Sequence, residues 1–416
     1  MTGRSLVGWL DYIERQHPQA IALGLDRVAK VLSRLDIRFS CPIITVGGTN
    51  GKGSTCAVLE AALRSAGYRT GLYTSPHLLR YNERVRVAGR EADDGIICEA
   101  FTEVERARGA VALTYFEFAT LAAFVIFSGA RLEALILEVG LGGRLDAVNV
   151  LDADCAVLTS VGIDHVEFLG DSREAIGREK AGIFRHGRPA VVADPQPPES
   201  VVAAIERVGA LPLQIGRDFG YAKQGTQWSF WGPGGKRPGL AHPSLRGAVQ
   251  LRNASAAFAA LDALKDRLPV AMKDLRRALA DVALPGRFQV LAGRPQVVLD
   301  VAHNPEAAAA LAENLGDSGF APETIAVFGM LKDKDIAGVV RAVSPRITRW
   351  HLATLPGPRG ATAGQLMEVL AAEKIRTPAT AHSSVSDALA AARKDAGESD
   401  KIVVFGSFLT VAGAYG

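Results

Sequence analysis

The chain has 416 residues, 48% of them hydrophobic and 22% charged, which is enough for two globular domains with sizeable cores. Its 47 basic residues barely exceed its 44 acidic residues, and no basic run carries interleaved aromatic residues, so we expect no nucleic-acid partner. The longest apolar stretch, residues 121–127, is too short to span a bilayer, residues 1–16 lack a signal-peptide core, and the four cysteines are scattered, which together predict a cytoplasmic protein without a membrane partner.

Helix-like and strand-like patterns alternate through both halves of the chain and predict an α/β protein without solenoid repeats. Leu6, Leu10 and Ile13 recur at helical spacing, which predicts an amphipathic helix over residues 4–16. The run L-G-L-D-R-V at residues 23–28 has the composition of a glycine turn followed by a helix start, and by itself it indicates no more.

Residues 43–55 read I-I-T-V-G-G-T-N-G-K-G-S-T, and the first half of the chain is organised around them. Their apolar, β-branched start predicts a buried strand, and residues 54–66 suit a helix. A glycine loop in this context can bind phosphate through backbone N–H groups and the charge of Lys52, while the hydroxyl of Ser54 or of the next threonine can reach a Mg²⁺ ion. The spacing differs from G-x-x-x-x-G-K-[ST], because Gly53 separates Lys52 from Ser54.

Two polar segments follow in the first half. Residues 69–74 are predicted as a second strand that enters T-S-P-H-L, where Ser75 offers a hydroxyl suited to Mg²⁺, although an isolated Ser-Pro pair is typical of an ordinary turn. In T-Y-F-E-F, Thr114 stands at an N-cap position with Glu117 three residues later, which predicts a capping box at the start of a helix.

Three charged or titratable residues follow buried elements. Glu138 ends a predicted strand over residues 133–139, where a carboxylate is costly to bury without a cation, so we interpret it as a Mg²⁺ ligand. His165 follows a strand over residues 155–161 and can either bind a metal or act as a hydrogen-bonded structural residue. Lys180 lies on a predicted helix, where its simplest interpretation is a solvated lysine.

Asn253 opens a predicted helix over residues 254–264, and the alternation of strands and helices starts again in the second half of the chain. Residues 225–243 predict a hairpin plus a surface loop, and the run L-P-G-R-F at residues 284–288 predicts the domain boundary, giving domains of 1–284 and 285–416. Strands are predicted near 296–300, 324–329, 348–352 and 401–405. Asn304 and Pro305 suit the cap and first turn of a helix.

These motifs resemble those of the Mur ligase superfamily, and within it the folylpolyglutamate synthase/dihydrofolate synthase family. The resemblance is carried by G-T-N-G-K-G-S-T, T-S-P-H-L, S-V-G-I-D-H-V-E-F-L-G, G-R-F, D-V-A-H-N-P and G-M-L-K-D-K-D, and it spans both domains except for about residues 186–245. It implies a P-loop-containing Mur-ligase-like central domain and a smaller Rossmann-like α/β C-terminal domain that contributes to ATP and glutamate binding.

The resemblance also implies roles for individual residues. The implied ATP contacts are Thr49, Asn50, Gly51, Lys52, Gly53, Ser54, Asn253, Arg287, Asp300 and His303. The implied ligands for two Mg²⁺ ions are Ser54, Ser75, Glu138 and His165, with a monovalent cation as a further candidate. The implied contacts of the pterin-bearing acid are Gly24, Leu25, Asp26, Arg27, Thr114, Tyr115, Phe116, Glu117, Leu145, Asp146 and Ala147. The implied catalytic residues are Lys52, His165 and Lys180.

In the Mur-type ligases the lysine matching Lys180 is often carboxylated by CO₂, which would turn a cation into an anion able to help hold Mg²⁺. Imidazole is an unusual ligand for Mg²⁺, so the role of His165 depends on the resemblance. The chain departs from the family at Val249, where a histidine is usual, and at Val301, where glycine is more frequent.

The implied reaction is ATP-driven amide formation through an acyl phosphate, with dihydropteroate or a reduced folate as the acid and L-glutamate as the amine. We expect a bifunctional enzyme of folate biosynthesis that acts as a monomer on small molecules. One alternative is folylpolyglutamate synthase alone. A ligase of cell-wall precursors is disfavoured because G-L-D-R, T-Y-F-E and L-G-G-R-L-D occur together. The alternatives from another class are a P-loop kinase and a regulatory NTPase.

Overall fold

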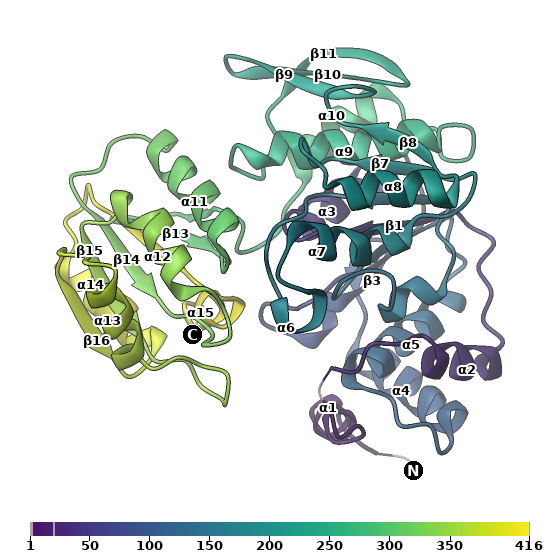
Figure 1. The fold of residues 1–416 in the computed structure, drawn as a ribbon, viewed down its shortest axis with the longest axis horizontal. Helices are drawn as coiled ribbons and strands as arrows, with labels where there is room; N and C mark the ends of the chain where they lie inside the picture. The colour runs from purple at the N-terminus through teal and green to yellow at the C-terminus, as the bar shows by residue number, and fades with distance from the viewer. Residues whose placement is uncertain (1–2, 20, 416) are drawn as a thin grey trace. The chain divides into compact units, whose positions relative to one another are not determined.

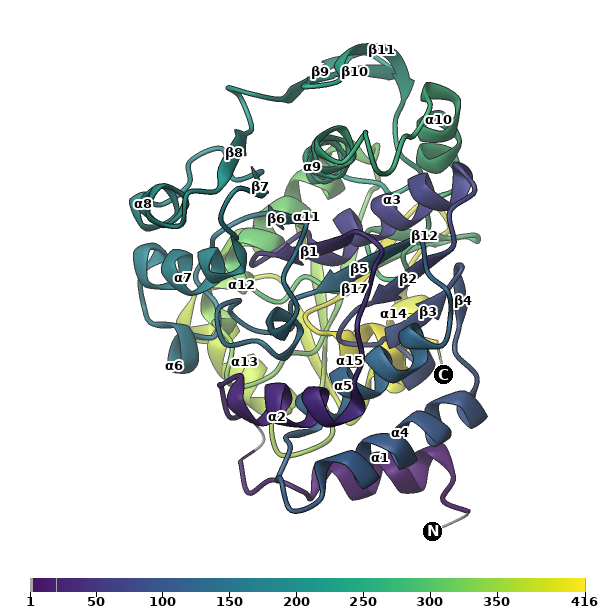
Figure 2. The same cartoon turned by 90° about the vertical axis from the view of Figure 1, so that its right-hand side faces the viewer.

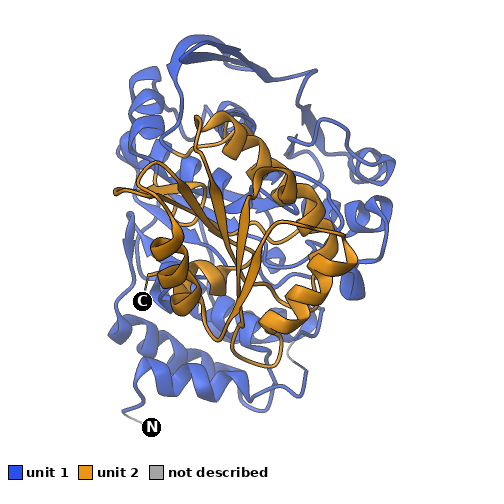
Figure 3. Ribbon diagram, turned by 90° about the vertical axis from the view of Figure 1, so that its left-hand side faces the viewer, with its two compact units in different colours: residues 1–244, 251–282 blue, residues 245–250, 283–416 orange. Residues whose placement is uncertain are grey.

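The computed structural model describes residues 3–19 and 21–415, which form two compact units (Figure 3). Unit 1 consists of the described residues within 1–244 and 251–282, and unit 2 of those within 245–250 and 283–416. Both units are α/β, as the sequence predicts, and each has its own parallel sheet. None of the helices in the described part of the chain combines the length and apolar character needed to cross a membrane.

Unit 1 is built on an eight-stranded sheet with the order β4-β3-β2-β5-β1-β6-β7-β8 (Figures 1 and 2). Its strands are β1 (Ile43–Gly47), β2 (Thr70–Tyr73), β3 (Val85–Val87), β4 (Arg90–Glu91), β5 (Ala134–Glu138), β6 (Cys155–Leu158), β7 (Pro189–Val192) and β8 (Leu211–Gln214). The pairs β2–β3 and β3–β4 at one edge are antiparallel, and the pairs from β2–β5 to β7–β8 are parallel. Val46 is in register with Glu138 on β5 and Val157 on β6, so three central strands end at one level.

Helices cover this sheet. They are α1 (Leu6–Glu14), α2 (Asp26–Leu35), α3 (Lys52–Ser65), α4 (Asp94–Arg108), α5 (Tyr115–Ser128), α6 (Val166–Leu169), α7 (Arg173–Lys180), α8 (Glu199–Val208), α9 (Val249–Ala263) and α10 (Met272–Asp281). The 3₁₀ segments are η1 (Tyr81–Arg84), η2 (Ala147–Val150) and η3 (Ala181–Ile183). Helix α5 is apolar nearly all round and buries Phe118, Phe124 and Phe127, which explains the apolar stretch noted in the sequence.

Two sequence predictions in unit 1 were wrong in detail. The sequence predicts a helix over residues 254–264 opened by Asn253, whereas α9 begins at Val249 and has Asn253 in its second turn. The side chain of Leu251 is buried, so the apolar face of the helix begins before Asn253. The surface loop expected after the hairpin is a strand: β9 (Gly220–Gln224), β10 (Gln227–Gly232) and β11 (Gly235–Ala241) form an antiparallel sheet. Strand β11 is an edge strand, where proline and glycine are tolerated.

Unit 2 contains a six-stranded sheet with the order β12-β13-β17-β14-β15-β16. Its strands are β12 (Gln289–Leu291), β13 (Gln296–Asp300), β14 (Thr324–Phe328), β15 (Arg349–Ala353), β16 (Ala379–His382) and β17 (Lys401–Phe405), and its helices are α11 (Pro305–Asp317), α12 (Ile336–Val343), α13 (Ala363–Ala372), α14 (Val385–Asp395) and α15 (Phe408–Gly413), with η4 (Ser344–Arg346). The four predicted strands are confirmed, and β12 and β16 were missed. Asn304 caps α11 with Pro305 in its first turn, as predicted.

Candidate active site

The glycine loop between β1 and α3 adopts a conformation that its glycines make possible. Gly48 and Gly51 have φ angles of 147° and 88°, in the region that favours glycine. A Cβ atom on Gly48 would lie 1.9 Å from the Thr159 hydroxyl oxygen, and one on Gly51 would lie 2.5 Å from Oδ1 of Asn253. Asn253, predicted as an ATP contact, is therefore packed directly against the loop.

The residues after β6 hold this loop in place. The N–H groups of Thr49 and Asn50 donate to the carbonyl and hydroxyl oxygens of Ser160, at 2.8 and 3.0 Å. The hydroxyl of Thr159 donates to the Asn50 carbonyl at 2.6 Å, and the N–H of Gly162 donates to the Thr49 hydroxyl at 2.9 Å. Sequence reasoning assigned no role to Thr159 and Ser160, although hydroxyl residues at the end of the strand beside β1 are a signal for such a brace.

Two lysines direct their ammonium groups at the loop. Nζ of Lys52 donates to the carbonyl oxygens of Gly48 and Thr49, at 3.2 and 3.3 Å. Nζ of Lys180 donates to the same Gly48 carbonyl at 2.9 Å, and its side chain is buried, so Lys180 is not a solvated lysine. Burial first, and then the charge of Lys52, lower the pKa of Lys180 from 10.5 to about 7, against the opposing effect of Asp164 and Asp146.

The predicted metal ligands supply hard oxygen atoms at neighbouring strand ends. Glu138 is buried at the end of β5, and its Oε2 accepts the N–H of Ser75 at 3.2 Å. Ser54 is buried in the first turn of α3, directly after the loop. Within the described ranges no three His, Cys, Asp or Glu side chains form a metal cluster. One carboxylate with hydroxyl groups nevertheless suits Mg²⁺, which keeps several waters and takes phosphate oxygens as ligands.

His165, the remaining predicted metal ligand, is a nitrogen ligand with an unusual backbone conformation. It has a φ angle of 53°, in the left-handed region, and it precedes α6. Its Nε2 lies 4.0 Å from Oδ2 of Asp164. A metal-ligand role for His165 stays a prediction.

The three segments predicted to contact the acid substrate come together in unit 1. The guanidinium of Arg27 donates to both carboxylate oxygens of Glu117, with an ion-pair distance of 2.8 Å. The N–H of Gly24 donates to the carbonyl of Leu145 at 3.4 Å. The predicted capping box is confirmed, since Thr114 and Glu117 exchange side-chain to backbone hydrogen bonds of 2.8 and 3.2 Å.

Asp146 is buried in the third of these segments. Its two carboxylate oxygens accept the N–H groups of Leu141 and Val148, at 2.8 and 3.1 Å. Burial raises the pKa of Asp146 to about 6, against these backbone hydrogen bonds and the charge of Lys52, which lower it. The Phe116 ring fills the space beside Gly140, where an added Cβ would lie 2.5 Å from it.

In unit 2, the predicted residues form a second cluster at the end of β13. Asp300 is half-buried, and its two oxygens accept the N–H groups of Phe288 and Ala302, both at 2.8 Å. Burial raises the pKa of Asp300, with Arg287 as the main opposing influence. The guanidinium of Arg287 lies 5.1 Å from the Phe408 ring centroid.

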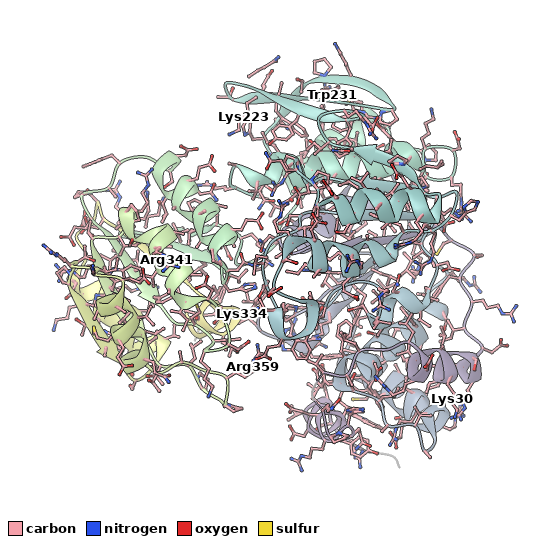
Figure 4. The ribbon with its side chains drawn as sticks, in the orientation of Figure 1. Lys30, Lys223, Trp231, Lys334, Arg341 and Arg359 are labelled. Atoms are coloured by element: carbon pink, nitrogen blue, oxygen red, sulfur yellow. The ribbon has the colours of Figure 1, made fainter. Side chains whose placement is uncertain are left out.

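The motif G-M-L-K-D-K-D after β14 is also fixed in place within unit 2. Asp333 forms a 2.6 Å ion pair with Arg359, which Figure 4 labels beside Lys334. The N–H of Lys332 donates to the Arg359 carbonyl at 2.9 Å. The loops after β14 and β15 therefore hold each other.

Comparison with known sequences finds two recognised domains in the chain. Residues 46–261 match the Mur ligase middle domain, and residues 286–408 match the Mur ligase glutamate ligase domain. The phosphate loop and the Asp300 cluster each fall within one of these matches. The protein is therefore a Mur ligase, an ATP-dependent enzyme that joins an acid to an amine.

Whole-chain relatives define the family more closely. The chain is 45% identical to dihydrofolate synthase/folylpolyglutamate synthase of Escherichia coli over 408 residues, covering 98% of this chain and 94% of the relative, and 41% identical to the protein of that name from Haemophilus influenzae, covering 98% and 96%. The chain belongs to the dihydrofolate synthase/folylpolyglutamate synthase family, which confirms the resemblance found in the sequence. The E. coli FolC structure in complex with DHPP and ADP matches with a TM-score of 0.95 at 44% identity, covering 99% of this chain and 97% of that one.

Proposed function

We propose that this chain forms an amide between L-glutamate and the carboxyl group of dihydropteroate or of a reduced folate, at the expense of ATP. The observation that carries the choice of acid is the convergence of the segments around Gly24, Glu117 and Asp146 in unit 1. The names of relatives that match this chain over 98% of its length include both activities, which supports a bifunctional enzyme.

The chemistry explains why a phosphate loop serves amide formation. A carboxylate is a poor electrophile because it would have to expel oxide. Transfer of the γ-phosphoryl group to a carboxylate oxygen gives an acyl phosphate and ADP, and the glutamate amine then attacks the acyl carbon and releases phosphate. The loop N–H groups that do not donate to Ser160 bind the phosphates, and the ammonium of Lys52 offsets the charge that develops on the transferred group.

Ser54, Ser75 and Glu138 are the residues that would hold Mg²⁺, with His165 assigned to a second ion and a monovalent cation as a further component. A bound divalent ion supplies charge neutralisation at the phosphates. A bifunctional relative has been crystallised with Mn, AMPPNP and L-glutamate, and it matches this chain with a TM-score of 0.91. Glu138→Ala should raise the Mg²⁺ concentration that supports half-maximal phosphate release by about tenfold or more, since it removes the carboxylate of the set. An unchanged Mg²⁺ requirement would remove Glu138 from the metal site.

We also infer that Lys180 carries a carboxyl group from CO₂ in the active enzyme. Carboxylation requires an unprotonated amine, and a pKa of about 7 leaves much of the amine in that form at neutral pH. Carboxylation would also turn the repulsion between the positive charges of Lys52 and Lys180 into attraction between opposite charges. Electron density at Nζ in a crystal grown with bicarbonate tests this, and a bare amine there counts against it.

The proposal also covers the role of unit 2 and the partners of the protein. The Asp300 cluster contributes to ATP binding and unit 2 to glutamate binding. The enzyme works as a cytoplasmic monomer on small molecules, without nucleic acid or membrane as partner.

The decisive experiment is phosphate release from Mg-ATP with dihydropteroate or tetrahydrofolate, each with and without L-glutamate. Release with both acids only when glutamate is present supports the bifunctional ligase. Release with tetrahydrofolate alone would leave folylpolyglutamate synthase, and release independent of any acid would favour a regulatory NTPase. Phosphate transfer to an acid without consumption of glutamate would favour a kinase.

A further inference from the structure

Arg84, at the end of η1, is a buried cation without an acidic partner among the described residues. It is 8% exposed, and the single hydrogen bond of its side chain runs from Nε to Nδ1 of His77, at 2.9 Å. The neighbouring carboxylate of Glu83 is occupied, because it accepts the N–H groups of residues 78–80 at 2.6, 2.7 and 2.7 Å. A guanidinium is costly to bury unless a negative or polar group meets it, so its terminal nitrogen atoms are left for a ligand.

The surroundings of Arg84 place it beside the substrate segments. Its guanidinium carbon lies 5.6 Å from the ring centroid of Tyr81 and 5.5 Å from that of Tyr115. Tyr115 belongs to the T-Y-F-E segment, and the next residue, Phe116, lies 6.1 Å from Tyr73 in ring-centroid distance. Arg84 is thus held by aromatic faces at the border of the site proposed for the acid.

The hydrogen bond from Arg84 also fixes the state of His77. Guanidinium nitrogen atoms only donate, so Nδ1 of His77 is the unprotonated acceptor and the imidazole carries its single proton on Nε2. His77 is half-buried, on the loop that follows β2. Among the described residues none accepts a hydrogen bond from this Nε2–H group, so it is a second oriented donor next to the guanidinium of Arg84.

We propose that Arg84 and His77 together bind an oxygen acceptor of the pterin-bearing acid, and so determine the affinity of the enzyme for that substrate. This inference rests on the function proposed above. A flat guanidinium with two free nitrogen atoms and a neutral N–H donor beside it match a carboxylate or a ring carbonyl oxygen. Both oxygen types occur in dihydropteroate and in reduced folates.

Steady-state kinetics of the full-length enzyme test the pair. Arg84→Met keeps the length of the side chain and removes its donors, and it should raise KM for both acids by about tenfold or more, as expected for lost hydrogen bonds of a charged group. KM for ATP and for glutamate should stay within about twofold, since neither substrate meets these donors. A rise of all three KM values together would overturn the proposal.

Substitutions of His77 separate the donor from a structural role, and they remain informative if Arg84→Met does not fold. His77→Gln places an amide N–H close to the position of Nε2, whereas His77→Asn keeps an acceptor for Arg84 and leaves nothing at Nε2. We expect a raised KM for the acid in His77→Asn and His77→Phe, and recovery to within about twofold of the wild type in His77→Gln. A glutamine variant that behaves like phenylalanine would contradict the donor role.

Binding of fragments without ATP identifies the acceptor. A simple pterin carries the ring carbonyl, and 4-aminobenzoylglutamate carries the carboxylates. Weaker binding of one fragment to Arg84→Met assigns the oxygen, and unchanged binding of both would overturn the proposal. If the wild-type enzyme releases phosphate without any acid, the proposed function fails. If the wild type is an acid-dependent ligase and His77→Phe has an unchanged KM, only this inference fails.

Discussion

The phosphate loop of unit 1 and the Asp300 turn of unit 2 both follow a buried parallel strand, but they use their charges differently. In the loop, the ammonium groups of Lys52 and Lys180 donate to neutral backbone carbonyls at 2.9 to 3.3 Å. In the turn, both oxygens of Asp300 accept backbone N–H groups. The bonds of Lys52 to neutral acceptors leave its charge available to an anionic ligand, whereas the carboxylate of unit 2 is largely committed to holding its own turn.

The largest effect should come from Lys52. Lys52→Ala removes the charge that meets the transferred phosphoryl group, so phosphate release should fall by about a hundredfold to a thousandfold. The fold should be kept because Lys180 still donates to the Gly48 carbonyl. Lys30, labelled in Figure 4, is an exposed lysine of α2 and provides the control, since Lys30→Ala should be fully active. Near-normal turnover of Lys52→Ala would refute the assignment of the loop.

Substitution of Lys180 tests whether burial of this lysine lowers the free energy of unfolding of the protein. Its folded-state pKa is lowered, so the unfolded chain binds more protons between pH 7 and 10.5, and stability rises with pH across that window. Lys180→Met should therefore be more stable than the wild type at pH 7, by on the order of 3 kcal/mol in CO₂-free buffer, with a difference that shrinks toward pH 10.

The same Lys180→Met variant should lose about a hundredfold in phosphate release, because no carboxylated lysine can form. Urea unfolding at pH 7 and pH 9.5 measures the first effect, and Lys30→Met is the matched control. A less stable Lys180→Met variant would show that burial of this lysine is compensated in the folded protein.

Asp146 is a buried carboxylate of unit 1, and its substitution should have a smaller effect than substitution of Lys52 or Lys180. Burial raises its pKa to about 6, so in the free enzyme the carboxylate forms as the pH rises through that value. If the charged form binds the acid substrate, affinity should increase between pH 5 and 7 in the wild type. Asp146→Asn should bind about tenfold more weakly and lose this pH dependence. Parallel pH profiles of binding for the two proteins would exclude Asp146 as the titrating group.

The contrast between the two regions also explains what the sequence could predict. Local patterns located β1, α3 and the Asn304 cap, because strand burial and helix capping are encoded within a few residues. The brace from Thr159 and Ser160 was missed because it depends on the pairing of β6 with β1, more than 100 positions earlier in the chain. Strand β11 was missed because its glycines and proline have loop composition, and its place at a sheet edge is a tertiary fact.

The smallest effect on chemistry should come from Asp300. Asp300→Ala leaves the N–H groups of Phe288 and Ala302 without their acceptor, which should lower the free energy of unfolding by about 1–3 kcal/mol. Asp300 holds the backbone next to Arg287, which precedes Phe288, and next to His303, which follows Ala302. KM for ATP should therefore rise several-fold, by about 1 kcal/mol of binding energy, and KM for the acid should not change. Asp300→Asn retains one acceptor oxygen, so its free energy of unfolding and its KM for ATP should lie between those of the wild type and of Asp300→Ala. Equal changes in both KM values, or none, would remove this turn from the ATP site, and the difference between the two regions would then be one of structure only.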